Sequence, residues 1–318
     1  MKRTIRVAIN GAGRIGRAVL RAFFENRSRF AGIDLVAMND PHDPEVLCHL
    51  LRYDTVHGKA PFAVSYSADQ GTLTCGDHTM ALLASRDIRT LPWKDLGVDI
   101  VLECTGRFKS LRDNQVHLEA GAKQVIISAP GASDVETTMV IGANEETIQS
   151  DTDILSIGSC STNALAPILS VLQDHNSIQS GFMTSVHAYT KDQSLVDAHH
   201  KDLRRARAAA CSIIPTKTGA AKAIGKVIPV LQGKLDGYAL RVPTANVSVL
   251  DINVLLERPC DAGQVRSWLT AAASQDKLGV IAVTNEPLVS CDFNHHPASS
   301  VVDLLQVQVV GSMVKLVV

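Results

Sequence analysis

The chain contains 318 residues, of which 46% are hydrophobic, and its 31 basic residues nearly cancel its 32 acidic residues. This length allows two domains of ordinary size, and the near-neutral charge argues against a protein that binds nucleic acid or a membrane surface. The sequence also lacks an apolar run of the roughly 18 residues that a membrane-spanning helix needs.

The cysteine content indicates the compartment. Seven is an odd number, and no two of these cysteines have the C-x-x-C spacing of a zinc site or a redox motif. Free thiols are typical of a reducing cytosol. We therefore predict a cytoplasmic protein without a metal site.

The first half of the chain alternates short apolar runs with helical patterns, and this alternation predicts βαβ units around a parallel sheet. Helices are expected at 14–26 and 43–51. Strands are expected at 5–9, 34–38, 80–84, 99–103, 124–128 and 153–157.

After residue 180 the pattern changes to longer runs, which indicate a mostly antiparallel sheet. These runs are 181–188, 237–255, 288–293 and 301–318. Two stretches, 217–230 and 262–274, have helical spacing. We predict an α/β protein with a Rossmann-type parallel-sheet domain over 1–159, followed by an α+β catalytic domain over 160–318.

The first expected strand runs into a glycine-rich turn that opens a helix. Gly11, Gly13 and Gly16 fit the G-x-G-x-x-G pattern, whose glycines let a pyrophosphate approach a helix N-terminus. Asp40 ends the second expected strand, where a carboxylate can bind a ribose diol and repel a 2′-phosphate. The alternative is a turn that serves only packing. The combined pattern favours a dinucleotide site that prefers NAD to NADP.

Cys160 lies between an apolar run at 154–157, an expected strand, and a helical pattern at 164–172. A thiol at a helix N-terminus is stabilised as the thiolate, which is a nucleophile. Pro167 is compatible with this helix only in its first turn. A buried structural cysteine is the alternative, and this segment alone does not distinguish the two.

His187 lies at the end of the apolar run 181–188. A cysteine nucleophile needs a base, and histidine is the usual one. Other histidines, such as His42, lie in polar, loop-like surroundings and are expected to be solvated. His187 is therefore the candidate base for Cys160.

Three clusters could hold an oxyanion. Ser161 lies beside Cys160, and 216–221 resembles another helix start, where free backbone N–H groups bind anions. Arg241 follows an apolar run and needs a partner, which could be a phosphate or a structural salt bridge. The basic run 201–207 lacks aromatic residues, so a solvated loop or a subunit contact is favoured over RNA binding.

These motifs occur together in one known family. The chain resembles the phosphorylating glyceraldehyde-3-phosphate dehydrogenases over nearly its whole length. The matching segments, in the family's order and spacing, are 11–17, 159–163, 187–190, 202–209, 216–223, 240–244 and 287–294.

The resemblance implies a role for each matching residue. Cys160 would be the nucleophile and His187 the base. The residues implied to contact NAD, with the three glycines of the turn, are Arg14, Ile15, Asp40, Arg86, Thr105 and Ser128. Those implied to bind the attacking inorganic phosphate are Ser159, Ser161, Thr218 and Gly219. Those implied to bind the substrate's own phosphate are Thr190 and Arg241, with Arg205 nearby.

The implied reaction oxidises glyceraldehyde 3-phosphate to 1,3-bisphosphoglycerate through a thioester on Cys160. The implied assembly is a homotetramer, in which the loop 189–214 lies at a subunit contact. Neither nucleic acid nor a membrane is an expected partner.

The chain departs from the family pattern at five places. Ala12 replaces Phe, Ser161 replaces Thr, and Ala164 replaces a second Cys. The pair 198–199 is Ala-His instead of Leu-Pro, which bears on the exclusion of NADP. The sequence ends at Val318, where the family continues with a W-Y-D-N-E-W-G-like segment and a long helix. That segment would supply an Asn that orients the nicotinamide carboxamide.

Two alternatives remain. Segments 197–200 and 293–297 lean towards erythrose-4-phosphate dehydrogenase, a close paralogue, whereas Thr190, Thr218 and Gly219 match the glyceraldehyde-3-phosphate form better. A member that binds NAD or a protein partner with little turnover is the second alternative.

Overall fold

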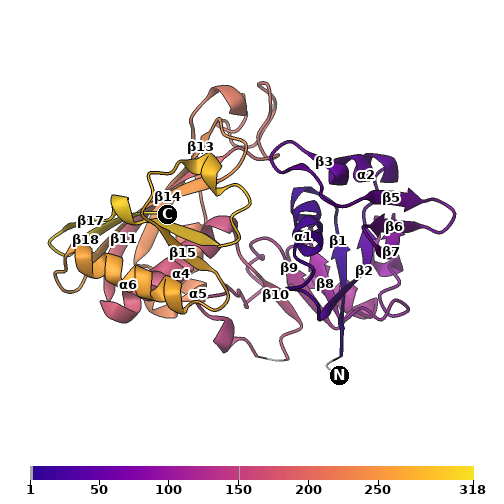
Figure 1. The fold of residues 1–318 in the computed structure, drawn as a ribbon, viewed down its shortest axis with the longest axis horizontal. Coiled ribbons are helices and arrows are strands. Elements are labelled where there is room, and N and C mark those ends of the chain that lie inside the picture. Colours follow the sequence, from indigo (N-terminus) through magenta and orange to yellow (C-terminus); the bar gives the residue numbers. More distant parts are fainter. Residues whose placement is uncertain (1–2, 150) are drawn as a thin grey trace. The chain divides into compact units, whose positions relative to one another are not determined.

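The computed structural model describes residues 3–149 and 151–318. They form two compact units, coloured from indigo to magenta and from magenta to yellow in Figure 1. The first comprises the described residues within Met1–Thr138 and Ile148–Gly158, and the second comprises Met139–Thr147 and Ser159–Val318. Segment 139–147 thus belongs to the second unit, although it precedes the last strand of the first. We expected a single boundary after residue 159 and did not predict this segment's placement.

The first unit is built on an eight-stranded sheet of order β10-β9-β8-β1-β2-β7-β6-β5, in which the six strands from β10 to β7 are parallel. The parallel strands, in chain order, are β1 (Ile5–Asn10), β2 (Ile33–Asn39), β7 (His78–Leu83), β8 (Ile100–Glu103), β9 (Gln124–Ile127) and β10 (Ile154–Ser156). Strands β2 and β7 lie on one side of β1, and β8, β9 and β10 lie on the other. This order is that of a doubly wound Rossmann sheet, with its switch point between β1 and β8.

The predicted parallel strands and helices of this unit are confirmed, because α1 (Arg14–Glu25) and α2 (Pro44–Arg52) also form. The antiparallel hairpin β5 (Val64–Ser67) and β6 (Thr72–Cys75) was not predicted. Nor was α3 (Leu111–Glu119), although Ser110 and Asp113 form a capping box that marks its start. A short pair of strands, β3 (Tyr53–Asp54) and β4 (Gly58–Lys59), follows α2.

The second unit is built on a six-stranded sheet of order β12-β13-β11-β14-β18-β17, in which only β11 and β13 pair in parallel. Its strands are β11 (Ile178–Ala188), β12 (Ile214–Lys217), β13 (Leu235–Val242), β14 (Ser248–Leu256), β17 (Gln308–Val310) and β18 (Met313–Val317). A separate parallel pair joins β15 (Ile281–Thr284) to β16 (Ser300–Asp303). The mostly antiparallel sheet is as predicted.

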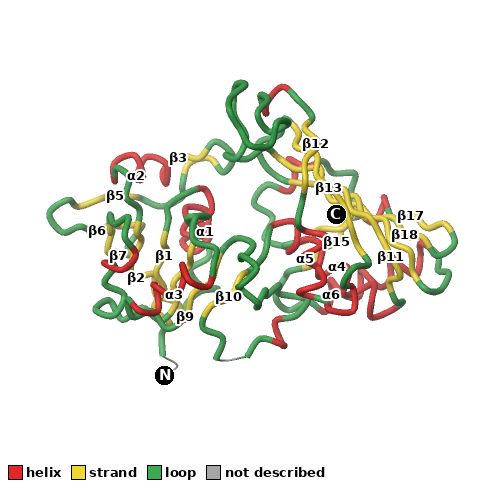
Figure 2. Tube along the Cα trace, turned by 180° about the vertical axis from the view of Figure 1, so that it is seen from behind, coloured by secondary structure: helices red, strands yellow, loops and turns green. Residues whose placement is uncertain are grey.

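Three helices bury their apolar residues against this sheet in one continuous core: α4 (Cys160–His175), α5 (Ala220–Val227) and α6 (Ala262–Gln275). Figure 2 shows them gathered beside the strands. Along β14 the alternate residues Leu250, Ile252 and Val254 face this core. The other face of the sheet exposes apolar side chains, among them Phe182, which is 70% exposed.

Three expectations for this unit were wrong in detail. The run 288–293 is not a strand, because Ser290–Phe293 is a turn of 3₁₀ helix. The run 237–255 is two strands, β13 and β14, divided by a turn in which Val247 has a φ of 67°. Similarly, 301–318 is divided among β16, β17 and β18.

Pro167 does not lie in the first turn of its helix, because α4 begins at Cys160. Its buried ring packs beside Gly142, where an added Cβ would lie 3.5 Å from the Pro167 Cβ. This contact attaches segment 139–147 to α4. The packing of the Pro167 ring thus compensates for the helix hydrogen bond that Pro167, without a backbone N–H, cannot form. Within the described ranges, no helix is long and apolar enough to cross a membrane.

Candidate active site

Cys160 is the first residue of α4, as the sequence predicted. Ser159 caps the helix, because its hydroxyl accepts a hydrogen bond from the Thr162 N–H at 3.1 Å. The first turn contains no acidic residue, so the partial positive charge of the helix N-terminus acts on the exposed cysteine unopposed. This position is the one that stabilises a thiolate.

His187, near the end of β11, is brought to the cysteine across 27 residues of sequence. Its Nε2 lies 3.3 Å from the Cys160 Sγ. Burial acts to raise the pKa of the Cys160 thiol, but the hydrogen bond and charge of His187 outweigh it and hold that pKa below the ordinary value. The pair therefore has the geometry of a nucleophile and its base.

Arg241 contacts the far side of the same imidazole. Strands β11 and β13 pair in parallel with His187 opposite Arg241, and the Arg241 Nη1 lies 2.6 Å from the His187 Nδ1. The same Nη1 donates to the Ala188 carbonyl at 3.0 Å, while the Arg241 Nε is buried without a partner. A buried guanidinium with an unused donor is suited to an anion.

Burial, followed by the charge of Arg205, lowers the pKa of Arg241 below its usual value. Arg205 itself forms an ion pair with Asp192, and its Nε donates to the Thr216 hydroxyl at 2.8 Å. Its guanidinium is therefore engaged by Asp192 and by residues of β12. Thr190 is exposed two residues beyond β11.

The residues predicted to hold the second phosphate lie at the starts of two helices. Ser161 is buried in the first turn of α4, and its hydroxyl lies 4.0 Å from the Cys160 Sγ. Gly219 is the N-cap residue of α5 and has no side chain to cap it, but the hydroxyl of the preceding Thr218 accepts from the Ala220 N–H at 3.2 Å. Helices α4 and α5 pack in the same core.

In the first unit, the glycine turn forms an open cradle after β1. Gly11 has a φ of 99°, and an added Cβ at Gly16 would lie 2.0 Å from the Gly11 carbonyl oxygen. At Gly13 an added Cβ would meet nothing within 4 Å, and no side chain caps α1 at this residue. The free backbone donors of α1 therefore fit the pyrophosphate of a dinucleotide.

The other predicted cofactor residues follow the carboxyl ends of neighbouring parallel strands. Asp40 follows β2, Arg86 is exposed after β7, Thr105 follows β8 and Ser128 follows β9. Ligands of doubly wound sheets bind at this edge, beside the switch point. Ile15, in the first turn of α1, is exposed, and Arg14 forms an ion pair with Asp54.

Asp40 is already bonded on both carboxylate oxygens. Its Oδ2 accepts from the Ala12 N–H at 2.7 Å, and its Oδ1 lies 2.5 Å from the His42 Nδ1. Burial acts to raise the pKa of Asp40, but these bonds lower it below the usual value. His42 was expected to be solvated. Its ring is largely exposed, yet it binds the carboxylate predicted to select the cofactor.

Sequence reasoning also missed a group of buried polar residues in the first unit that includes Glu103 and His117. The signal was Glu103 at the end of the expected strand 99–103. A charged residue at the last position of a buried strand is unusual enough to mark it.

Comparison with known proteins covers almost the whole chain. Residues 159–318 match the model described as glyceraldehyde 3-phosphate dehydrogenase, C-terminal domain. Residues 5–111 match the NAD binding domain of the same family. The chain is 49% identical to the chromosomal glyceraldehyde-3-phosphate dehydrogenase of Cupriavidus necator, over 98% of this chain and 92% of that protein. The glyceraldehyde-3-phosphate dehydrogenases of Xanthobacter flavus and Pseudomonas aeruginosa are 48% and 49% identical over the same shares.

Proposed function

Because this chain belongs to the glyceraldehyde-3-phosphate dehydrogenase family, we propose that it oxidises glyceraldehyde 3-phosphate to 1,3-bisphosphoglycerate with NAD and inorganic phosphate. The observation that best supports this proposal is the 3.3 Å contact between the Cys160 Sγ and the His187 Nε2 at the start of α4. Acyl transfer through a thioester requires such a pair.

In the proposed first step, Cys160 passes its proton to the His187 Nε2 and attacks the aldehyde carbon, and the aldehyde oxygen takes that proton back, which forms a thiohemiacetal. His187 then takes the hydroxyl proton at Nε2 while the carbon loses a hydride and becomes a thioester. NAD, when bound, supplies the two-electron acceptor for that hydride. The backbone N–H groups of the first turn of α4 favour the charge that develops beside Cys160.

In the second step, inorganic phosphate attacks the thioester carbon and releases the Cys160 thiolate, which leaves an acyl phosphate. We assign this phosphate to Ser159, Ser161, Thr218 and Gly219, since hydroxyl groups and free helix donors occur at both helix starts. Arg241 and Thr190 are assigned to the phosphate carried by the aldehyde. The unpartnered Nε of Arg241 supports its assignment.

The Arg241 contact also bears on the state of the base. An Arg can only donate, so Arg241 favours a His187 whose Nδ1 lacks a proton. When Arg241 turns to the substrate phosphate, the Nδ1–H can donate to the Ala188 carbonyl, 2.6 Å away, and Nε2 is left free to accept a proton. Substrate binding would thereby prepare the base.

The proposed function is tested by NADH absorbance with the aldehyde, NAD and phosphate. We expect NADH only when all three are present, and none with Cys160→Ser. A higher kcat/KM for erythrose 4-phosphate than for glyceraldehyde 3-phosphate would contradict the substrate assignment, and NAD binding without turnover would contradict the activity.

We further propose a homotetramer in the cytoplasm. Family membership supports the assembly, as do the exposed apolar residues of the loop 189–214, where Leu195 is 78% and Leu203 83% exposed. The seven free cysteines support a reducing compartment. Analytical ultracentrifugation tests the assembly, and a monomer at micromolar concentration would contradict it.

A further inference from the structure

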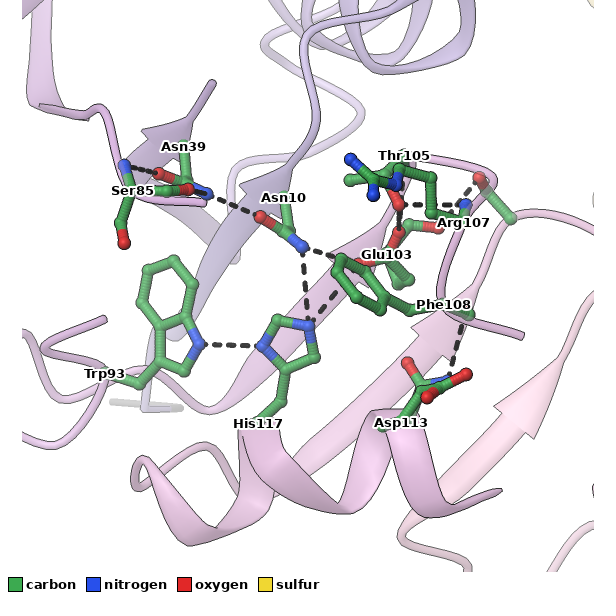
Figure 3. A network of polar contacts seen from close by, with 12 residues as sticks. Asn10, Asn39, Ser85, Trp93, Glu103, Thr105, Arg107, Phe108, Asp113 and His117 are labelled. Atoms are coloured by element: carbon green, nitrogen blue, oxygen red, sulfur yellow. Dashed lines mark hydrogen bonds and ion pairs between the residues drawn. The ribbon is translucent and has the colours of Figure 1, made fainter. Parts of the chain in front are cut away.

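A chain of buried polar side chains joins three parallel strands of the first unit at their carboxyl ends (Figure 3). Asn10 ends β1, Asn39 ends β2 and Glu103 ends β8. The Asn39 Nδ2 donates to the Asn10 Oδ1 at 2.8 Å, and the Asn10 Nδ2 donates to the Glu103 Oε2 at 2.6 Å. The reaction steps described above use none of these side chains.

The carboxylate at the centre has no cationic partner. Glu103 is 1% exposed, and within residues 3–149 and 151–318 its one recorded ion-pair partner is His117, which is 0% exposed. The Trp93 Nε1–H can only donate, and it lies 2.9 Å from the His117 Nδ1. The imidazole proton is therefore on Nε2, which faces the Glu103 Oε2 at 3.4 Å, and the ring is neutral.

A buried carboxylate without a cation is costly unless hydrogen bonds satisfy it. Every partner of Glu103 is a donor: Asn10 and His117 on Oε2, and Thr105 on Oε1. Thr105 provides two bonds, one from its backbone N–H at 2.8 Å and one from its hydroxyl. Thr105, at the cofactor edge, therefore provides two of the four hydrogen bonds that compensate this buried charge.

Thr105 in turn supports the glycine turn. An added Cβ at Gly11 would lie 2.7 Å from the Thr105 nitrogen and 2.8 Å from its Cγ2. The hydroxyl donates to Glu103 and accepts from the Arg107 N–H at 3.1 Å, so the methyl group faces Gly11. The proton of this hydroxyl is thus used inside the protein and is not offered to a ligand.

We propose that Glu103 is a positioning residue for NAD, which acts through Thr105 to hold the Gly11–Gly13 turn in the conformation that receives the pyrophosphate. The inference rests on the NAD-binding part of the proposed function and not on the identity of the aldehyde. It distinguishes Glu103 from a residue that only stabilises the fold.

A double-mutant cycle on NAD affinity tests this role. Glu103→Gln keeps the size of the side chain but replaces one carboxylate oxygen by an NH₂ group. Because all the partners of Glu103 are donors, one of them loses its hydrogen-bond acceptor. Thr105→Val removes the hydroxyl and keeps the methyl against Gly11. Titration calorimetry of NAD into the whole chain should show Kd raised about tenfold by Glu103→Gln and about threefold by Thr105→Val. The double variant should match Glu103→Gln alone.

Glu119→Gln provides the matched control, because Glu119 is the exposed last residue of α3, the helix that carries His117. It should leave the Kd unchanged. Additive effects in the cycle would overturn the proposal, since they would mean that Thr105 contacts NAD independently of Glu103. An unchanged Kd in a Glu103→Gln variant that unfolds at lower urea would overturn it as well.

Should Glu103→Gln fail to fold, Trp93→Phe tests the same path more mildly. It removes the donor that fixes the His117 tautomer, and we expect KM for NAD to rise about threefold with kcat and KM for the aldehyde unchanged. Equal changes in all three constants would overturn the proposal. If the effects of Glu103→Gln and Thr105→Val on the Kd of NAD are coupled as expected, but the protein does not oxidise the aldehyde, the positioning role is supported and the proposed reaction is contradicted.

Discussion

Cys160 begins a helix in the second unit and Glu103 ends a strand in the first, and the surroundings of the two residues differ. Cys160 is exposed, and its Sγ contacts only His187 and Ser161 among the described side chains. Glu103 is sealed from solvent and uses both oxygens within the protein. A reacting atom must remain accessible to its substrate. A positioning group, in contrast, acts through hydrogen bonds that it forms within the protein before the ligand binds.

The largest effect in this comparison is expected at the reacting atom itself. Cys160→Ser should lower kcat about 10⁴-fold or more, because a serine hydroxyl is not ionised at neutral pH. NAD affinity should not change, since the cradle lies in the other unit. The measurement is NADH production beside calorimetric NAD titration, and a changed Kd would break the separation of roles between the units.

The base is expected to contribute less than the nucleophile. His187→Asn should lower kcat about 10³-fold. It should also move the midpoint of Cys160 alkylation by iodoacetamide to higher pH, because the hydrogen bond and charge that lower the thiol pKa are lost. The thiolate forms above its pKa, so the variant reacts more slowly at pH 7. An unshifted alkylation profile would show that the helix N-terminus alone activates Cys160.

Among the described glycines of the first unit, Gly16 has the least room for a side chain. Gly16→Ala should destabilise that unit by about 3 kcal/mol, because its Cβ would lie 2.0 Å from the Gly11 carbonyl oxygen. Gly13→Ala is the control, since its Cβ meets nothing within 4 Å. Urea denaturation can be followed by Trp93 fluorescence in a Trp268→Phe background. Equal stability of the two alanine variants would contradict the described turn.

Arg241 separates substrate binding from cofactor binding. Arg241→Gln should raise KM for glyceraldehyde 3-phosphate about 30-fold, through the loss of a charged phosphate contact. KM for NAD should stay within error. A proportional rise in both constants would indicate general damage to the protein, and Lys222→Gln on the nearby helix α5 serves as the control for loss of positive charge.

The smallest effect is expected at a surface ion pair beside the cradle. Burial acts to raise the pKa of Asp54, but bonds from the His57 and Val56 N–H groups and from Arg14 lower it to about 2. A lowered carboxyl pKa stabilises the protein above the unfolded pKa of 3.8, and this stability is lost as the pH falls through about 2. Asp54→Asn should therefore cost about 1 kcal/mol at pH 7 and nothing near pH 2. If the difference in urea midpoint between Asp54→Asn and the unchanged protein does not depend on pH, the ionised Asp54 carboxylate is not the cause of the stabilisation.

Local patterns predicted the parallel strands well because β1, β2, β8 and β9 are continuous apolar runs bounded by turns. The same patterns did not predict strands in which polar and apolar residues alternate weakly, and they did not reveal short turns. The hairpin β5–β6 reads Val-Ser-Tyr-Ser and Thr-Leu-Thr-Cys, a weak alternation that is stabilised by pairing with β7 and by burial of Val64, Leu73 and Cys75 in the core. The run 288–293 has the hydrophobicity of a strand, but the chain turns there in a 3₁₀ helix.

The candidate site was predicted as residue types and motifs, and the partners of those residues came from the tertiary structure. The ion pair between Arg205 and Asp192 joins residues 13 positions apart, and no short motif predicts it. The role of Glu103 depends on β1, β2 and β8 lying side by side, which brings together residues up to 93 positions apart.

The sequence by itself determined the glycine turn, the cysteine at a helix start and the parallel strands of the first unit, because these depend on neighbouring residues. Only the tertiary structure decided that His187 reaches Cys160, that Arg241 contacts His187 across the pairing of β11 with β13, and that a buried carboxylate supports the cradle. The physical reason is that proton positions and pKa values depend on atoms a few ångströms away in space, and strand pairing brings those atoms together from distant parts of the chain.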